Sequence, residues 1–338
     1  YVDWKKISAK GGPASGWKQE QQEKIKILFE NENFILIGHD LKQLLKALKL
    51  QNIIVKNKLF DVMIASYILN SSTRAHDLPS LVMRELNQEL SAGSNQGSLF
   101  GVDPKIAADK LVFVLDLYNK FSKELEARAD LGLFEKIEMK LIPVLAEAEL
   151  NGIAIDKKML EDLSVKVNTS IKNITKDIHN EAGQEFNVSS SQQLREVLFA
   201  KMNLPAEGIK KGKTGYSTAA SELEKLHGTH PIIEMIEEYR ELEKLRNTYI
   251  DVLPNLVNAK TGRIHTSFNQ AVTTTGRLSS SEPNLQNIPI RTEIGREIRR
   301  AFIAEPGHEL VAADYSQIEL RIVASLAEDE KMIEIFKD

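Results

Sequence analysis

The most constraining feature of the sequence is a junction near its C-terminal end, where an apolar run meets an aspartate and then a helical pattern. Residues 310–313 have the composition of a buried strand, Asp314 follows at once, and a helix pattern begins at Ser316. A carboxylate at the tip of a buried strand could bind a metal ion. A structural interpretation competes with this one. Ser316 and Glu319 have the spacing of a capping box, in which each side chain satisfies the other residue's backbone N–H.

The N-terminal third of the chain has the pattern of an α/β domain, because short strand-like runs alternate with helical runs. The expected helices are at 20–29, 40–50, 59–70 and 104–129, the expected strands are at 34–38 and 52–55, and a Gly- and Ser-rich loop is expected at 92–101.

Long helices dominate the middle of the chain, and strands return after it. The expected elements are a helix at 134–151 kinked at Pro143, a strand at 152–155, a helix from Asp156 to about residue 182, a second helix pair separated by residues 204–217, and a helix at 231–253. Residues 261–270 alternate like a strand. Its partner is expected to be either residues 301–304 or the strand that leads to Asp314.

Composition describes a soluble, intracellular chain of two or three domains. With 338 residues and roughly 150 residues per domain, the chain is long enough for that number. It has no cysteine, which excludes disulfides and thiolate metal sites, and no apolar stretch approaches the ~18 residues of a membrane span. A net charge of −4 leaves DNA binding open, because local basic clusters decide it. Two such clusters are at residues 210–213 and 291–300, and each is as readily explained as a solvated surface.

Two long strings identify a family. Residues 314–321 resemble motif A of the family A DNA polymerases, the bacterial DNA polymerase I or Klenow-type enzymes. Upstream, residues 273–291 resemble the segment of the same family that contacts primer and template. The resemblance covers nearly all of the chain.

The resemblance implies three domains. Residues 1–130 would form an incomplete 3′–5′ exonuclease domain of ribonuclease H-like fold, residues 131–258 the helical thumb, and residues 259–338 the first antiparallel strands of the palm. The overall class is thus α/β plus α.

The family's exonuclease ligands are not matched here. Where the second exonuclease motif has Asn and Asp, this chain has Asp40 and Leu44, and where the third has Tyr and Asp, it has Ile106 and Lys110. The first motif has no counterpart. A leucine offers no oxygen to a hard cation and a charged lysine repels it, so the domain is expected to be a structural remnant. Asp61 and Asp77 are expected to be a helix-surface residue and a helix cap.

The resemblance also implies a nucleotidyl-transfer site with Mg²⁺ as cofactor and deoxynucleoside triphosphates as substrates. Asp314 would bridge two ions, and Tyr315 would add its backbone carbonyl. Glu319 would exclude the 2′-hydroxyl of a ribonucleotide, which is compatible with a capping role, while Gln317 and Ile318 would line the nucleotide.

Primer–template DNA is the implied partner. Arg277 would reach the minor-groove edge of the primer-terminal pair, where every base pair offers an acceptor. Backbone contacts to DNA are expected from Asn284, Gln286, Asn287 and Arg291, and at the tip of the thumb from Lys213, Thr214 and Ser217. For the last three, an ordinary solvated loop is the alternative.

The family also uses a fingers helix and a second palm carboxylate, both C-terminal to motif A. The chain stops at Asp338, so it is expected to be catalytically incomplete by itself. Three functions therefore stay open: template-directed DNA synthesis, a DNA-binding fragment without activity, and an active 3′–5′ exonuclease. A monomer in the bacterial cytoplasm, associated with the nucleoid, is expected.

Overall fold

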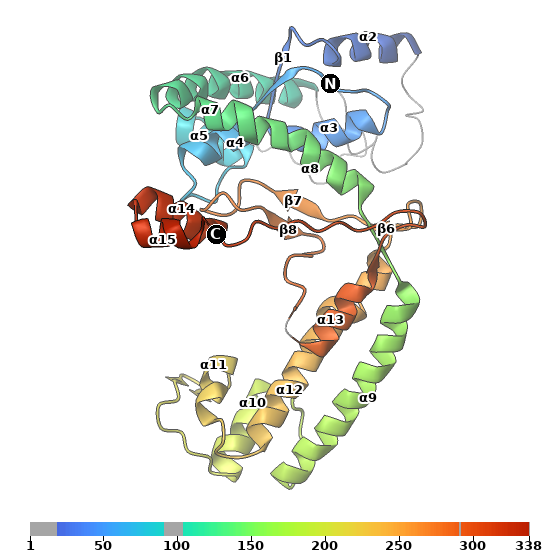
Figure 1. Ribbon diagram of the computed structural model, residues 1–338, viewed down its shortest axis with the longest axis vertical. Coiled ribbons are helices and arrows are strands. Elements are labelled where there is room, and N and C mark those ends of the chain that lie inside the picture. The colour runs from blue at the N-terminus through green and yellow to red at the C-terminus, as the bar shows by residue number, and fades with distance from the viewer. Residues whose placement is uncertain (1–18, 91–103, 291, 338) are drawn as a thin grey trace.

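A computed structural model describes residues 19–90, 104–290 and 292–337. The loop expected at 92–101 lies outside these ranges. Figure 1 shows an α/β region at the top and a long arm of helices below it. Strands and two short helices lie between these two parts. Among the described residues, none of the helices combines the length and the apolar character that crossing a membrane requires.

The upper region is built around two parallel strands, β1 (Ile35–Gly38) and β2 (Lys58–Asp61). The helices around them are α2 (Gln19–Phe29), α3 (Leu41–Lys49), α4 (Val62–Leu69), α5 (Leu78–Leu86) and α6 (Pro104–Ala127), followed by the short α7 (Leu131–Leu133). One apolar core joins β1, β2 and the helices α3 to α7, and its largest fully buried side chains include Phe121, Phe134 and Leu117.

Most elements expected in this region are confirmed, with two exceptions. Residues 52–55 form no strand, and residues 59–61, expected to open a helix, are the end of β2. Both errors have one cause. Short apolar runs do not distinguish strand from helix by periodicity, and pairing with β1 decided the outcome.

A long helix leads out of the upper region. A π-helical turn, Phe134–Glu138, runs directly into α8 (Met139–Asn151), and Pro143 lies inside that helix. Proline has no N–H and its ring crowds the carbonyl four residues earlier, so a widened turn just before that position relieves the conflict. Gly152 ends α8 with a φ of 61°, a conformation that favours glycine.

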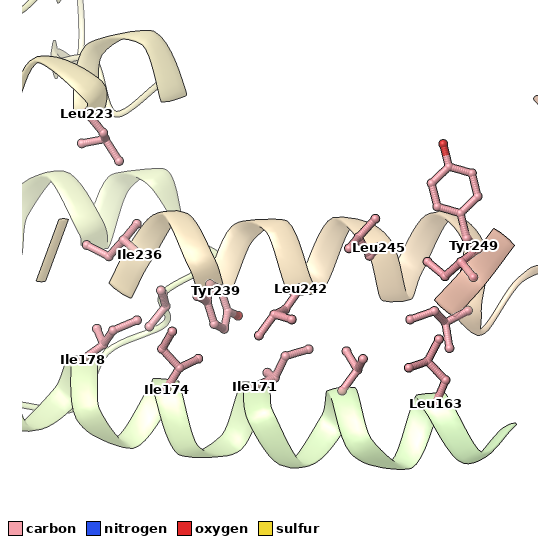
Figure 2. Packing of buried hydrophobic residues seen from close by; sticks show 14 of the residues in the cluster. Leu163, Ile171, Ile174, Ile178, Leu223, Ile236, Tyr239, Leu242, Leu245 and Tyr249 are labelled. Atoms are coloured by element: carbon pink, nitrogen blue, oxygen red, sulfur yellow. The ribbon is translucent and has the colours of Figure 1, made fainter. Parts of the chain in front are cut away.

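The arm consists mainly of two long helices that lie side by side (Figures 1 and 2). Asp156 caps α9 (Lys157–Ala182) as expected, by accepting the N–H of Met159. The buried side chains of α9 recur every three or four residues and face those of α12 (Ile232–Leu245) and the π-helical turn Arg246–Ile250. Each fully buried aliphatic side chain contributes roughly 1.5–3 kcal/mol, so this seam stabilises the arm.

The far end of the arm carries short elements. They are α10 (Ser191–Arg195), the π-helical turn Glu196–Lys201, the hairpin β4 (Lys211–Gly212) and β5 (Gly215–Tyr216), α11 (Ala220–Leu223) and the 3₁₀ turn Glu224–Leu226. The 3₁₀ turn Leu253–Leu256 follows the π-helical turn Arg246–Ile250 at the other end of α12.

Two small antiparallel sheets are formed by strands on both sides of the arm in the sequence. In the first, β3 (Ile153–Ile155) lies between β6 (Arg263–Ile264) and β9 (Phe302–Ile303). In the second, β7 (Ser267–Asn269) pairs with β8 (Ser279–Ser281). Neither partner expected for residues 261–270 is therefore correct, because β3 pairs with β6 and β8 pairs with β7. The remaining helices are α13 (Glu293–Arg300), α14 (Ile318–Ala327) and α15 (Glu330–Ile335).

Candidate nucleotide and DNA site

The segment before Asp314 is not the buried strand that its composition predicts. Residues 310–317 are exposed and form neither helix nor strand, and Val311 is 89% exposed. A strand becomes buried only when a neighbouring strand and a covering layer are present, and the described part of the chain supplies neither here. The carboxylate of Asp314 is exposed.

The capping box at this junction is also not formed. The N-cap of α14 is Gln317, which has a φ of 51° and no side-chain capping bond. Arg321 stabilises the turn instead, by donating to the carbonyl of Ser316 at 3.0 Å and to that of Phe336 at 3.0 Å. Ser316 and Glu319 are therefore not bound to each other, and the Glu319 side chain is free to point elsewhere.

Glu319 lies beside Arg277. Nη2 of Arg277 is 3.3 Å from Oε1 of Glu319, and both side chains are about three-quarters exposed (77% and 72%). The contact joins the two strings that carry the family resemblance, which are far apart in sequence. Gln317 and Ile318 precede Glu319 at the start of α14, and both are exposed.

Arg277 itself belongs to the loop that connects β7 to β8. The carbonyl of Arg277 accepts the hydroxyl of Thr273 at 2.7 Å, and Gly276 has a φ of 79°. The side chain of Arg277 therefore projects from a closed turn.

The predicted DNA-contact residues after β8 lie on an irregular segment. Hydrogen bonds between side chains and its backbone hold this segment in place. The Oδ1 atom of Asn284 accepts the N–H of Gln286 at 3.0 Å, and the carbonyl of Asn287 accepts the hydroxyl of Tyr249 at 2.6 Å. The side chains of Asn284, Gln286 and Asn287 are exposed. Arg291 lies outside the described residues.

The remaining three candidates lie on the β4–β5 hairpin at the far end of the arm. Arg195 holds this hairpin by donating from Nη1 to the carbonyl of Thr214 and from Nε to the carbonyl of Tyr216, both at 2.7 Å. Lys213 and Thr214 are exposed, and Ser217 is half-buried. In Figure 1 this end of the arm is well separated from α14, so the structure brings together only part of the predicted set.

Mg²⁺ is the ion that the family resemblance implies. It is usually held by one or two carboxylates together with waters and substrate phosphates. Asp314 fits that pattern, because its carboxylate is exposed and no protein hydrogen bond to it is found among the described residues. Over those same residues, no three His, Asp or Glu side chains gather into a complete metal site.

The carboxylates of the upper region do not fit a metal. Asp61 is 1% exposed, and its oxygens accept three backbone N–H groups: Leu41 at 2.7 Å, Met63 at 2.9 Å and Asp40 at 3.2 Å. Burial raises the pKa of Asp61 to about 6, against the opposing effect of these hydrogen bonds. The expectation of a helix-surface residue was wrong, because Asp61 is a buried N-cap of α4. Asp77 is confirmed as the cap of α5.

Four positions stand where the family has exonuclease ligands, and they lie on or near α3 and on α6. Leu44 packs against the apolar core of the upper region. Asp40 is half-buried, and burial raises the pKa of its carboxyl group. Lys110 lies on α6, and nothing is described of the side chain of Ile106.

Local sequence patterns did not reveal the contacts between the upper region and the β7–β8 hairpin. Glu149 is fully buried and accepts the N–H of Phe268 at 2.8 Å, while Lys42 and Lys46 lie 2.6 and 2.5 Å from its oxygens. Tyr67 accepts the N–H of Gly276 at 2.9 Å. Only Glu149 had a weak sequence signal, because it shares a face of α8 with Ile142 and Ala146. The leucines of α3 define its apolar face, so helical periodicity assigns Lys42 and Lys46 to the exposed side.

Comparison with known proteins supports the resemblance. The family described as "DNA polymerase family A" matches residues 157–338, which is more than half of the chain, and "DNA polymerase I, ribonuclease H-like domain" matches residues 15–95. DNA polymerase I of Chloroflexus aurantiacus is 42% identical over 91% of this chain and 34% of its own length. The thermostable DNA polymerase I of Thermus thermophilus is 44% identical over 82% of this chain and 32% of its own length.

A solved structure has the same fold. The POL domain of Pol1 from M. smegmatis, in complex with DNA primer-template and dNTP, superimposes with a TM-score of 0.82 at 34% identity, over 96% of this chain and 55% of that one. The chain spans about a third of the length of the curated relatives named above. These matches show that the chain belongs to DNA polymerase family A and carries a ribonuclease H-like domain ahead of the polymerase-family region.

Proposed function

We propose that this chain takes part in template-directed DNA synthesis, by binding primer–template DNA and deoxynucleoside triphosphates and by supplying Asp314 to a Mg²⁺-dependent nucleotidyl transfer. The observation that carries the proposal is the contact between Arg277 and Glu319, which joins the primer-contact segment to the motif A segment on one exposed surface. The solved relative in complex with primer-template and dNTP supports the same assignment.

The reaction needs a primer 3′-hydroxyl placed in line with the α-phosphorus of the nucleotide. Bound Mg²⁺ would polarise the phosphate oxygens and favour ionisation of the attacking hydroxyl. Asp314 and the carbonyl of Tyr315 would hold the ion. The side chain of Glu319, next to the sugar, would leave no room for a 2′-hydroxyl, while Gln317 and Ile318 border the nucleotide.

The three domains are assigned on the same basis. Residues 1–130 are the ribonuclease H-like domain, residues 131–258 are the thumb, and residues 259–338 begin the palm. A pair of long helices with a hairpin at its tip suits a thumb that grips duplex DNA. Lys213, Thr214 and Ser217 on that hairpin would contact phosphates, which fixes position without reading sequence.

We infer further that the ribonuclease H-like domain does not hydrolyse DNA. Metal-dependent hydrolysis needs carboxylate oxygens that are free to bind ions. The oxygens of Asp61 are occupied by backbone N–H groups, and Leu44 has none. The inference predicts that the chain leaves labelled single-stranded DNA intact in Mg²⁺ or Mn²⁺. Digestion that Asp314→Ala does not affect would contradict it.

A second candidate is a DNA-binding role in which the catalytic site is completed by residues outside this chain. It is favoured by the single carboxylate of Asp314, because no metal-binding group of three acidic or histidine side chains occurs in the residues described. Either way, a monomer in the bacterial cytoplasm and at the nucleoid is proposed, since the substrate is DNA.

Primer extension with four deoxynucleotides and Mg²⁺ tests both candidates, with primer–template binding followed in parallel. Metal assistance is worth several kcal/mol, so loss of the ligand in Asp314→Ala is expected to slow extension on the order of 10³-fold. Asp329→Ala, on an exposed cap of α15, is the matched control and should extend normally. Binding without extension would support the second candidate. No preference for primer–template over a single strand of equal length would contradict both.

A further inference from the structure

We propose that the ribonuclease H-like domain is the scaffold that fixes the loop bearing Arg277, and that Tyr67 is the positioning residue. The inference rests on the proposed DNA contact of Arg277. Its central observation is a hydrogen bond between two distant parts of the chain: the hydroxyl of Tyr67, on α4, accepts the backbone N–H of Gly276 at 2.9 Å. Gly276 is the residue immediately before Arg277.

The loop is bound to α4 and its C-terminal extension at two points. Besides the Gly276 contact, the hydroxyl of Ser71 donates to the carbonyl of Thr274 at 3.2 Å. The turn between these points is closed internally by Thr273, whose hydroxyl donates to the carbonyl of Arg277. The backbone on the N-terminal side of Arg277 is therefore fixed relative to the upper region, although the Arg277 side chain is exposed.

Tyr67 is itself held rigidly. Its residue is 4% exposed, and its ring packs edge-on against His76, with centroids 5.8 Å apart. Both ring nitrogens of His76 are engaged, Nδ1 with the hydroxyl of Ser66 at 2.9 Å and Nε2 with the carbonyl of Thr73 at 3.0 Å. Arg84 donates to the Ser66 oxygen at 2.9 Å. The hydroxyl of Tyr67 thus has little freedom to follow a moving loop.

The other end of the hairpin is anchored independently. Glu149 accepts the N–H of Phe268 on β7, and Lys42 of the upper region donates to both the carbonyl of Phe268 and Glu149. Ala271, between the two anchors, packs against the apolar core of the upper region. The connection from β7 to Arg277 is therefore held by the ribonuclease H-like domain through Lys42, Tyr67 and Ser71, and by α8 through Glu149. This gives the domain a role that needs none of its own metal ligands.

The test combines Tyr67→Phe with Arg277→Ala and measures primer–template affinity at one fixed ionic strength. Tyr67→Phe keeps the buried ring and removes one hydrogen bond, which is worth about 1 kcal/mol, so affinity should fall roughly fivefold. If Tyr67 acts through Arg277, the double variant binds no more weakly than Arg277→Ala alone. Losses that multiply would overturn the proposal. Tyr118→Phe is the control, because the Tyr118 ring packs edge-on against Phe60 in the apolar core of the upper region, and the loop contacts come from Tyr67 and Ser71 instead.

Amide hydrogen exchange at Gly276, measured without DNA, separates this proposal from the proposed function. Exchange should accelerate in Tyr67→Phe and not in Tyr118→Phe, because only the first change frees that N–H. Unchanged exchange overturns the scaffold role of Tyr67 whatever the DNA result. A different outcome is also possible: exchange is faster in Tyr67→Phe, but Arg277→Ala binds primer–template as tightly as the original chain. That outcome would refute the proposed DNA contact of Arg277, and the scaffold would then have no role in DNA binding.

Discussion

Asp61 and Asp314 occupy the same kind of place in the sequence and opposite kinds of place in the structure. Each follows an apolar run and precedes a helix. Asp61 ends a paired strand, is buried, and has its oxygens bound by three backbone N–H groups. Asp314 follows an unpaired, exposed segment and makes no hydrogen bond within the described residues.

The difference shows how a structural carboxylate is distinguished from a candidate ligand. Both could have been helix caps by sequence alone. A carboxylate whose oxygens already satisfy backbone donors has little capacity left for a cation, whereas an exposed one keeps all of it. The same contrast applies to two glutamates: Glu149 is buried between lysines, and Glu319 is exposed beside Arg277.

The largest expected effect on stability is that of Glu149→Ala. It would leave Lys42 and Lys46 without their partner in a buried setting, and breaking such a pair costs roughly 3–5 kcal/mol. Glu147→Ala, two residues away on the same helix, is the matched control, because its pair with Lys49 is about half exposed and is worth less than about 1 kcal/mol. Urea unfolding measures both. If the two variants lose equal free energy of unfolding, the Glu149 side chain is not buried between the lysines.

Asp61→Ala is expected to cost roughly 3 kcal/mol, because it removes a buried cap and strands three backbone donors. Asp77→Ala removes a cap of the same type from an exposed position, and about 1 kcal/mol is expected. The comparison is made by thermal or denaturant unfolding. An Asp61 variant as stable as the Asp77 variant would break the distinction between the buried and the exposed carboxylate.

The two buried carboxylates should respond to pH in opposite directions. Burial raises the pKa of Asp61 to about 6. The contribution of Asp61 to the free energy of unfolding is therefore full below the pKa of this residue in the unfolded chain, and it is lost as pH rises through about 6. For Glu149, burial acts to raise the pKa, but hydrogen bonds from Lys42 and Lys46 outweigh it and the pKa is lowered. The contribution of Glu149 to the free energy of unfolding is therefore present above the pKa that this residue has in the unfolded chain, and it is lost as pH falls.

Isosteric variants isolate these two effects. Between pH 4 and 7, the stability advantage of the original chain over Asp61→Asn should shrink as pH rises, by at most roughly 3 kcal/mol. Its advantage over Glu149→Gln should instead shrink as pH falls below the unfolded pKa of a glutamate. Unfolding free energies measured at a series of pH values check both slopes. Parallel slopes would contradict the opposite assignments.

The sequence predicted elements best where local signals and packing agree. The cap at Asp156 and the apolar spacing of α9 predicted that helix to its ends. It failed where pairing over long distances decides the outcome. Residues 52–55 and 310–313 are strand-like in composition and unpaired in the structure, and residues 261–270 pair through β3 and β8 rather than through either expected partner.

The residues of the candidate site could be predicted from the sequence, but the hydrogen bonds that hold their loop in place could not. Motif strings identified Arg277 and Glu319, and the structure brings them together. Tyr67 and Glu149 contact backbone N–H groups of Gly276 and Phe268, and a backbone partner leaves no trace in side-chain patterns. Such contacts become visible only once the ribonuclease H-like domain and the β7–β8 hairpin are placed side by side.

The smallest expected effect is at Glu319, and it completes the comparison. Its pair with Arg277 is exposed and screened by salt, so Glu319→Gln should leave the unfolding free energy unchanged to within about 0.5 kcal/mol. The pair nonetheless restrains an arginine that is proposed to contact DNA. Releasing it should therefore tighten primer–template binding slightly at low salt, and the gain should vanish as ionic strength rises. The measurement is a salt series of dissociation constants for Glu319→Gln and for Glu328→Gln, an exposed residue just after α14. If Glu319→Gln changes the free energy of unfolding and not the DNA affinity, Glu319 is a structural carboxylate like Asp61 and not a functional one like Asp314.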